Sequence, residues 1–202
     1  MGKEQNSAYY DKVYKTSTEY AKPWQESRYR KVWERMMQRF YKDNVVLDLG
    51  CGVGQCARMF FDKGFERYIG VDFSKEAIEK AISSIDLNGF TFALSDLFQF
   101  FEIDHINYHL YKMIFIENSN VNFFLCETLE HIEKDTELLD LICQNFPGNQ
   151  IAISVPTFDD PSHVRHFKST SEVRERYGEF MTSIDLSQIG PWIIMTGKTA
   201  KA

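Results

Sequence analysis

Three glycines at alternate positions follow a buried-strand signal and could bring backbone amides close to a bound ligand. They are Gly50, Gly52 and Gly54, and Asp48 stands just before them, near the end of the apolar run. Glycine lacks a Cβ, so the chain can turn sharply there and approach a ligand closely. Asp48 would repel a pyrophosphate but would attract the ammonium group of a bound amino acid. The dinucleotide fingerprint G-x-G-x-x-G is not met, because Gln55 stands where its third glycine would be.

Two further acids follow the next two strand-like runs of the sequence. Asp72 ends the second run and Asp96 follows the third. Ligands bind at the carboxyl ends of strands in parallel α/β sheets, so all three acids should face one crevice. Asp72 could accept hydrogen bonds from ribose hydroxyls, and Phe73 beside it could pack on adenine. Asp96 could accept the adenine amino group, while the backbone amide of Leu97 could reach a ring nitrogen.

The elements that would position these residues alternate along the chain. We predict strands over residues 45–49, 68–71, 90–94, 121–125 and 150–155, and closing strands over 180–186 and 192–196. Helices are expected over residues 24–41, 55–63, 74–85, 127–144 and 171–177. Such alternation predicts a parallel sheet with helices on both faces, ending in a hairpin. The segment 98–120 is longer than a crossover needs and is interpreted as an insertion near the ligand face.

From about Val45 to its end the chain resembles the class I (Rossmann-like) S-adenosylmethionine-dependent methyltransferases. The resemblance rests on the glycine loop and on the acids that follow the second and third strands in register with it. It implies a seven-stranded, mostly parallel sheet with an antiparallel last strand, helices on both faces and an N-terminal helical lid. It also implies that S-adenosylmethionine is bound by Asp48, Gly50, Cys51, Gly52, Gly54, Asp72, Phe73, Asp96 and Leu97. We add Cys126, at the end of the fourth strand, to the same site.

The size and charge of the chain limit the kinds of partner it could have. At 202 residues we expect one domain, with a lid over 1–43 and a Rossmann-like core over 44–202. A net charge of −6 argues against a broad nucleic-acid surface. The basic cluster is expected to be a solvated helix face, and it consists of Arg28, Arg30, Lys31, Arg35 and Arg39. The sequence shows no signal peptide, no membrane-spanning run and no zinc-like cysteine spacing, so we expect a reduced, cytoplasmic setting. It predicts no oligomeric state.

The fourth strand leads into an acidic motif with a histidine. Glu127, Glu130 and His131 resemble the E-x-x-E-H of ubiquinone-type O-methyltransferases and small-RNA 2′-O-methyltransferases, in which it can hold a divalent ion. On one helix the three would share a face, and His163 or His166 could add a ligand. The alternative is a helix start whose acids are favoured by the helix dipole, and we assign no metal. The Asn/Asp-Pro-Pro-aromatic motif of nucleobase amino-methyltransferases is absent, which argues against that substrate class.

The loop over residues 156–167 offers groups for proton transfer and anion contact. Its segment from His163 through Arg165 resembles a His-Val-Arg-aromatic string of small-molecule and sugar-modifying relatives. The alternative is a surface loop in which Arg165 pairs with Asp159 or Asp160.

The segment around Trp24 and Tyr29 resembles the Pro-Trp…Ser-x-Tyr start of the Nod-factor N-methyltransferases, where it covers the cofactor. We therefore place Trp24 and Tyr29 in the cofactor site, with simple core packing as the alternative. This segment and the loop 156–167 should form opposite walls of the acceptor pocket, with His163 facing the methyl group.

We predict an S-adenosylmethionine-dependent methyltransferase that acts on oxygen or nitrogen of a small-molecule acceptor. Methyl transfer is an in-line displacement at an activated carbon, so alignment carries much of the catalysis. His163 is the first candidate for a general base, and His131 is the second. The alternatives are metal-assisted O-methylation of a larger acceptor (RNA or a glycan) and a protein that binds the cofactor without transferring methyl. A nicotinamide oxidoreductase is the most distant alternative.

Overall fold

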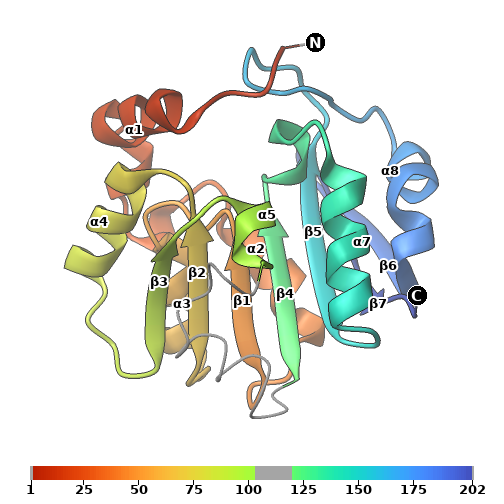
Figure 1. Ribbon diagram of the computed structural model, residues 1–202, viewed down its shortest axis with the longest axis horizontal. Coiled ribbons are helices and arrows are strands. Elements are labelled where there is room, and N and C mark those ends of the chain that lie inside the picture. The colour runs from red at the N-terminus through yellow and green to blue at the C-terminus, as the bar shows by residue number, and fades with distance from the viewer. Residues whose placement is uncertain (1, 103–119, 202) are drawn as a thin grey trace. The chain divides into compact units, whose positions relative to one another are not determined.

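A computed structural model of the chain describes residues 2–102 and 120–201 (Figure 1). The chain forms two compact units. The first comprises Asn6–Arg30 and Tyr41–Asn122, and the second comprises Met1–Gln5, Lys31–Phe40 and Phe123–Ala202. Residues 103–119, which make up most of the predicted insertion, lie outside the described residues.

The strands form one seven-stranded sheet in the order β3-β2-β1-β4-β5-β7-β6. They are β1 (Val45–Leu49), β2 (Tyr68–Asp72), β3 (Phe90–Leu94), β4 (Val121–Cys126), β5 (Gln150–Pro156), β6 (Met181–Ile189) and β7 (Trp192–Thr199). β2 runs parallel to β1 and β3, whereas β7 runs antiparallel to β5 and β6. Every residue of β1, β2 and β5 is buried, as expected for strands covered on both faces. The predicted mostly parallel sheet with an antiparallel last strand is confirmed.

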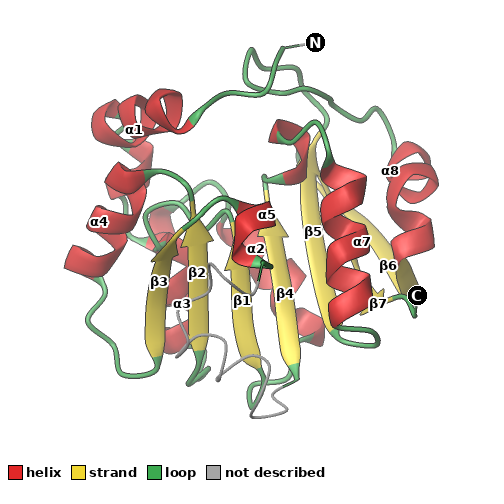
Figure 2. Cartoon of the chain, viewed as in Figure 1, coloured by secondary structure: helices red, strands yellow, loops and turns green. Residues whose placement is uncertain are grey.

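Helices lie in front of and behind the strands within each unit (Figure 2). The α-helices are α1 (Ser7–Thr16), α2 (Arg30–Met36), α3 (Gln55–Asp62), α4 (Lys75–Ser84), α5 (Leu97–Phe100), α7 (Asp135–Asn145) and α8 (Thr170–Tyr177). Short 3₁₀ turns are η1 (Glu19–Ala21), η2 (Trp24–Glu26), η3 (Met37–Arg39), η5 (Leu129–His131) and η6 (Gly178–Phe180). Among the described residues, no helix is both long and apolar enough to cross a membrane.

Two helices predicted from the sequence are interrupted. The helix expected over 24–41 breaks at Ser27, whose extended backbone follows η2 and whose Oγ accepts a hydrogen bond from the Tyr29 amide at 3.2 Å. The helix expected over 127–144 starts late, because Glu127 has a φ of 55° that a right-handed helix excludes. Glu130 and His131 lie in η5 instead, so the three residues of the E-x-x-E-H motif do not share one helix face.

Part of the basic cluster binds β6 rather than forming a solvated face. Arg35 donates hydrogen bonds to Asp185 at 2.6 Å and to Ser187 at 3.1 Å. Arg39 donates to the backbone carbonyl of Ser183 at 2.6 Å. Two of the five cations are therefore used to fasten the segment 31–40 to the edge of the sheet, which weakens the case for a phosphate-binding surface there.

Asp48 is buried within the sheet, with only 2% of its surface exposed. Its Oδ2 accepts a hydrogen bond from the hydroxyl of Tyr68 on the neighbouring strand β2 at 2.5 Å. Burial raises the pKa of Asp48 to about 7, although the bond from Tyr68 opposes this rise. Asp48 is thus an acid that the fold holds partly protonated near neutral pH.

Replacing Asp48 by Asn should remove a pH dependence of stability. The folded carboxyl stays protonated up to about pH 7, whereas the unfolded one loses its proton near 3.8, so its stabilisation is lost as the pH rises. Between about pH 5 and pH 7, the free energy of unfolding of the wild type should fall by about 2 kcal/mol more than that of the variant. Chemical denaturation of the ligand-free protein measures this, with the exposed Asp86→Asn as control. If the free energy of unfolding changes with pH in the same way in the wild type and in Asp48→Asn, the raised pKa of Asp48 is contradicted.

Candidate functional site

The glycine loop between β1 and α3 is held in a conformation that only glycine adopts without strain. Gly50, Gly52 and Gly54 have φ values of 87°, 54° and 77°. The amides of Gly50 and Cys51 both donate to the carbonyl of Val71 on β2, at 2.8 and 3.0 Å. A Cβ placed on Gly54 would come within 3.2 Å of the Phe92 ring. The loop therefore carries no side chain at these three positions, and at Gly54 the missing Cβ leaves room for the Phe92 ring.

Asp72, at the end of β2, ties this loop to the start of α4. Its side chain is buried, and its Oδ2 accepts a hydrogen bond from the Gly52 amide at 2.9 Å. Its Oδ1 accepts one from the Ser74 amide at 2.8 Å. Burial raises the pKa of Asp72 to about 6, against the opposing effect of these backbone donors. A buried carboxylate beside bare backbone is suited to a ligand that brings hydroxyl donors, as a ribose does.

The third predicted acid lies at the end of the neighbouring strand. Asp96 is exposed and caps α5, because its Oδ1 accepts from the amides of Phe98 and Gln99 at 2.8 and 3.3 Å. The amide of Ser95 donates to the Asp72 carbonyl at 3.0 Å, so the ends of β2 and β3 are joined. Leu97 begins α5. The structure thus brings the glycine loop, Asp72 and Asp96 to the same end of three adjacent strands.

Several predicted cofactor residues are engaged elsewhere in the same unit. Cys51 is buried against β2, where a Cβ on Gly70 would come within 2.8 Å of its Sγ. The indole of Trp24 is buried and donates to Asp62 of α3 at 2.8 Å. The hydroxyl of Tyr29 accepts a hydrogen bond from its neighbour Arg28 at 2.6 Å. The assignments of Trp24 and Tyr29 to the cofactor site stay predictions.

The structure adds residues of α1 that sequence reasoning did not select. A Cβ on Gly52 would lie 3.1 Å from the hydroxyl of Tyr14. The ring of Tyr10 lies 5.4 Å, centroid to centroid, from that of Phe73, the residue after Asp72. The tyrosines recur at a spacing of four, which is a helical signal, but α1 has no buried residue, so the usual apolar pattern is missing.

In the second unit, Glu127 is held in a left-handed conformation at the end of β4. Its Oε2 accepts a hydrogen bond from the indole of Trp192 at 2.8 Å, and its Oε1 accepts one from Ser154 at 3.1 Å. The hydroxyl of Ser154 also lies 3.2 Å from the thiol of Cys126. A non-glycine residue with a φ of 55° stores strain, and such residues are concentrated at functional sites.

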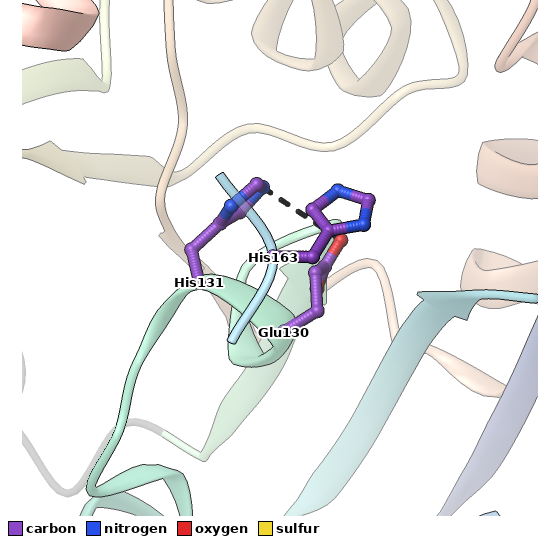
Figure 3. Close-up of side chains that lie close together, drawn as sticks. All are labelled: Glu130, His131 and His163. Carbon is purple, nitrogen blue, oxygen red and sulfur yellow. Dashed lines mark ion pairs between the residues drawn. The ribbon is translucent and has the colours of Figure 1, made fainter. Parts of the chain in front are cut away.

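Glu130, His131 and His163 form a compact cluster of possible metal ligands (Figure 3). One ligand atom from each lies within 4.8 Å of the others, and His131 Nε2 is 3.8 Å from Glu130 Oε1. Glu130 is fully buried, and neither of its carboxylate oxygens has a hydrogen-bond partner among the residues that the structure describes. Burial raises the pKa of Glu130 well above its ordinary value, and the charge of Glu127 adds to this rise.

Both histidines of the cluster are held with Nδ1 toward a backbone carbonyl. His131 Nδ1 is 3.0 Å from the carbonyl of Ser162, and His163 Nδ1 is 3.4 Å from that of Phe158. Burial lowers the pKa of His131 to about 4 and also lowers that of His163. A neutral imidazole that donates from Nδ1 keeps a lone pair on Nε2, so each Nε2 can accept a proton or bind a metal ion.

The loop that carries His163 is anchored by Arg165. This side chain lies 3.0 Å from the buried carboxylate of Asp135 and donates to the carbonyl of Leu129 at 2.6 Å. The alternative pairing with Asp159 or Asp160 is wrong, because Arg165 is bound by the Leu129 carbonyl of η5 and by the buried carboxylate of Asp135 at the start of α7. His166 instead has Nδ1 3.7 Å from an oxygen of Asp159, so His163, not His166, joins the cluster.

Comparison with solved structures shows the fold. A S-adenosylmethionine-dependent methyltransferase from Anabaena variabilis is 14% identical with a TM-score of 0.69, covering 100% of this chain and 98% of that one. A chain in the complex of the Haloferax volcanii Trm112 activator with a methyltransferase is 14% identical with a TM-score of 0.66, covering 99% and 100%. The methyltransferase domain of bacterial CtHen1-C is 17% identical with a TM-score of 0.61, covering 89% and 100%.

Comparison of sequences identifies the family. Protein arginine N-methyltransferase 1 of Saccharomyces cerevisiae is 43% identical over 51 residues, which are 25% of this chain and only 14% of that protein. The family described as "Methyltransferase domain" matches residues 41–185, more than half of the chain, and includes the glycine loop and all three strand-end acids. This chain therefore belongs to the methyltransferase domain family, and its cofactor is S-adenosylmethionine.

Proposed function

We propose that the protein transfers the methyl group of S-adenosylmethionine to oxygen or nitrogen of a small-molecule acceptor. The observation that carries the proposal is the left-handed glycine loop bound to a buried acid, Asp72. When bound, the cofactor supplies a methyl group already activated on a positive sulfur, so the protein has to align the reactants and exclude water. A small acceptor is favoured because the net charge is −6 and Arg35 and Arg39 are engaged by β6.

Each part of the cofactor has proposed partners in the first unit. The Asp72 carboxylate would accept hydrogen bonds from the ribose hydroxyls, with Phe73 packing on the adenine. Asp96 would accept the adenine amino group beside the Leu97 amide. The backbone of residues 50–54 would face the methionine part of the cofactor. Asp48 would attract the ammonium group of that part.

Replacing Asp72 by Ala or Asn should weaken binding of the cofactor product S-adenosylhomocysteine by about 10- to 100-fold. This factor corresponds to the net loss of one hydrogen bond to a charged group, which is worth about 1.5–3 kcal/mol. Calorimetry measures it, with Asp86→Asn as control and melting curves to confirm folding. Because Asp72 also holds the glycine loop, Asp96→Ala is a second variant, and it should weaken binding without affecting that loop. Unchanged affinity in all of these variants would overturn the site.

His163 is the proposed general base for a hydroxyl acceptor. Its imidazole is neutral at physiological pH, because burial lowers its pKa, and its Nδ1 faces the carbonyl of Phe158. Nε2 can therefore accept the acceptor's proton. His131 is the weaker candidate, since a pKa of about 4 makes it a poor base.

Replacing His163 by Ala should lower kcat on a hydroxyl acceptor by about 10²- to 10⁴-fold, with little change in cofactor affinity. An acceptor that arrives as a neutral amine should be affected much less. A panel of hydroxyl and amine acceptors, assayed for S-adenosylhomocysteine release, supplies the measurement. His166→Ala is the matched control in the same loop. Cofactor binding with no turnover on any acceptor would favour a protein that binds the cofactor without transferring methyl.

Metal-assisted O-methylation is a second candidate, favoured by the buried carboxylate of Glu130, which accepts no hydrogen bond from the residues that the structure describes. The donor set fits a divalent transition ion, because two neutral imidazoles and a carboxylate converge and each Nδ1 faces a backbone carbonyl. Glu130, His131 and His163 would hold the ion, which would supply Lewis-acid activation of a hydroxyl. The carboxylate of Glu127, the other acid of the E-x-x-E-H motif, instead accepts hydrogen bonds from Trp192 and Ser154.

A chelator separates these two candidates. We expect turnover to persist in EDTA, because neutral His163 can serve as the base without an ion. If EDTA abolishes turnover and Mn²⁺ or Zn²⁺ restores it, metal-assisted methylation becomes the favoured candidate. In that case the ion should raise the melting temperature of the wild type and of the exposed control Glu133→Gln, but not that of Glu130→Gln.

A further inference from the structure

The first residues of the chain lie in the second unit, although the helix that follows them lies in the first. Residues 2–5 run beside the loop after β5, and α1 begins at Ser7 (Figure 1). This segment has neither helix nor strand, so its place depends on specific contacts. Those contacts join it to the two stretches of chain that carry the cluster of Glu130, His131 and His163.

The first contact is with the loop that carries His163. The amide of Gly2 donates a hydrogen bond to the backbone carbonyl of His163 at 2.9 Å. A Cβ placed on Gly2 would lie 2.0 Å from the carbonyl oxygen of Pro161 and 3.1 Å from that of Asp160. A side chain at this position would therefore push the segment away from the loop.

The second contact is with the chain just after η5. Glu4 Oε2 accepts a hydrogen bond from the amide of Glu133 at 2.7 Å. The carbonyl of Glu133 accepts a hydrogen bond at 3.0 Å from Arg165, which lies two residues after His163 in the loop. Glu133 is thus bound through its amide by the N-terminal segment and through its carbonyl by the loop of His163.

The loop and η5 are also joined directly, through the neighbours of His163. The amide of Val164 donates to the carbonyl of Glu130 at 2.8 Å, and His131 Nδ1 lies 3.0 Å from the carbonyl of Ser162. A shift of the loop would therefore move the imidazole of His163 relative to Glu130 and His131. Because residues 2–4 bind both stretches of chain, they restrict such a shift.

We propose that Gly2 and Glu4 are positioning residues for His163, which keep its loop against η5 and its Nε2 in the orientation that the reaction needs. The inference rests on the proposed function, because it assumes that His163 takes the proton of a hydroxyl acceptor. Gly2 and Glu4 act through the loop and contact neither acceptor nor cofactor. A misplacement of about 1 Å caused by a distant residue can lower a rate by about 100-fold, so contacts outside the site can control turnover.

Variants of the segment, assayed on hydroxyl and neutral amine acceptors, test the proposal. Gly2→Ala displaces the segment and Glu4→Ala removes the acceptor of the Glu133 amide, so each should lower kcat on a hydroxyl acceptor by about tenfold. A neutral amine does not require the base, so its kcat should change little. Glu4→Gln keeps a side-chain oxygen and should retain most of the rate. Lys3→Ala, on the exposed residue between them, is the matched control and should match the wild type.

A double-variant cycle separates the positioning of His163 from a general loss of structure. In the His163→Ala background the imidazole is absent, so Gly2→Ala and Glu4→Ala should lower kcat no further. Equal losses in both backgrounds would overturn the proposal, and so would rates for both variants that match Lys3→Ala. If His163→Ala itself leaves turnover on hydroxyl acceptors unchanged, the proposed base fails and the positioning role fails with it.

Hydrogen exchange tests the contacts without an acceptor. The amides of His163 and Val164 donate to the carbonyls of Asp160 and Glu130, and they should exchange faster in Gly2→Ala and Glu4→Ala than in the wild type, Glu4→Gln and Lys3→Ala. Affinity for S-adenosylhomocysteine should be the same in every variant, because the proposed cofactor residues lie in the first unit. Equal exchange in all variants would overturn the positioning role alone. If the wild type does not bind S-adenosylhomocysteine, the proposed function fails as well.

Discussion

The first unit depends on one buried carboxylate, that of Asp72. Removing a charged acid from water is costly unless donors replace the lost hydration. Here the amides of Gly52 and Ser74 do so. Gly52 lies within the left-handed loop, and Ser74 caps the start of α4. The requirement to compensate a single charge therefore fixes the loop, the start of a helix and, through Ser74, the position of α1.

Two buried acids of the second unit, Asp135 and Glu130, differ in the hydrogen bonds that their carboxylates accept. Asp135 accepts hydrogen bonds from Arg176 at 2.7 and 2.8 Å and from Tyr177 at 2.7 Å, and it also pairs with Arg165. Glu130, five residues earlier and equally buried, has no such bond to its carboxylate among the described residues. A compensated acid stabilises its surroundings, whereas an uncompensated one retains the capacity to bind a proton or a cation. This contrast separates the structural acid from the functional candidate.

Much of the first unit was predictable because its signals are local. Apolar runs marked the strands, and the alternating glycines marked a turn that other residues would strain. Helix α1 was missed because none of its residues is fully buried, so no apolar stripe marks it; hydrogen bonds of Asp11 and ring contacts of its tyrosines hold it instead. The partner of Arg165 was missed because Asp135 is thirty residues away, and composition near the loop pointed to Asp159 and Asp160 instead. The positive φ of Glu127 could not be foreseen, since β5 and β7 impose it through Ser154 and Trp192.

The strain at Glu127 has a consequence for how this protein could be stabilised. A non-glycine residue in the left-handed region carries a penalty of about 1–3 kcal/mol, which glycine would relieve. Glycine would also abolish the carboxylate that Trp192 and Ser154 orient. Position 127 is therefore a point of conflict between rigidity and chemistry. Selection for heat resistance alone should discard this glutamate, whereas selection for turnover should retain it if the oriented carboxylate serves the reaction.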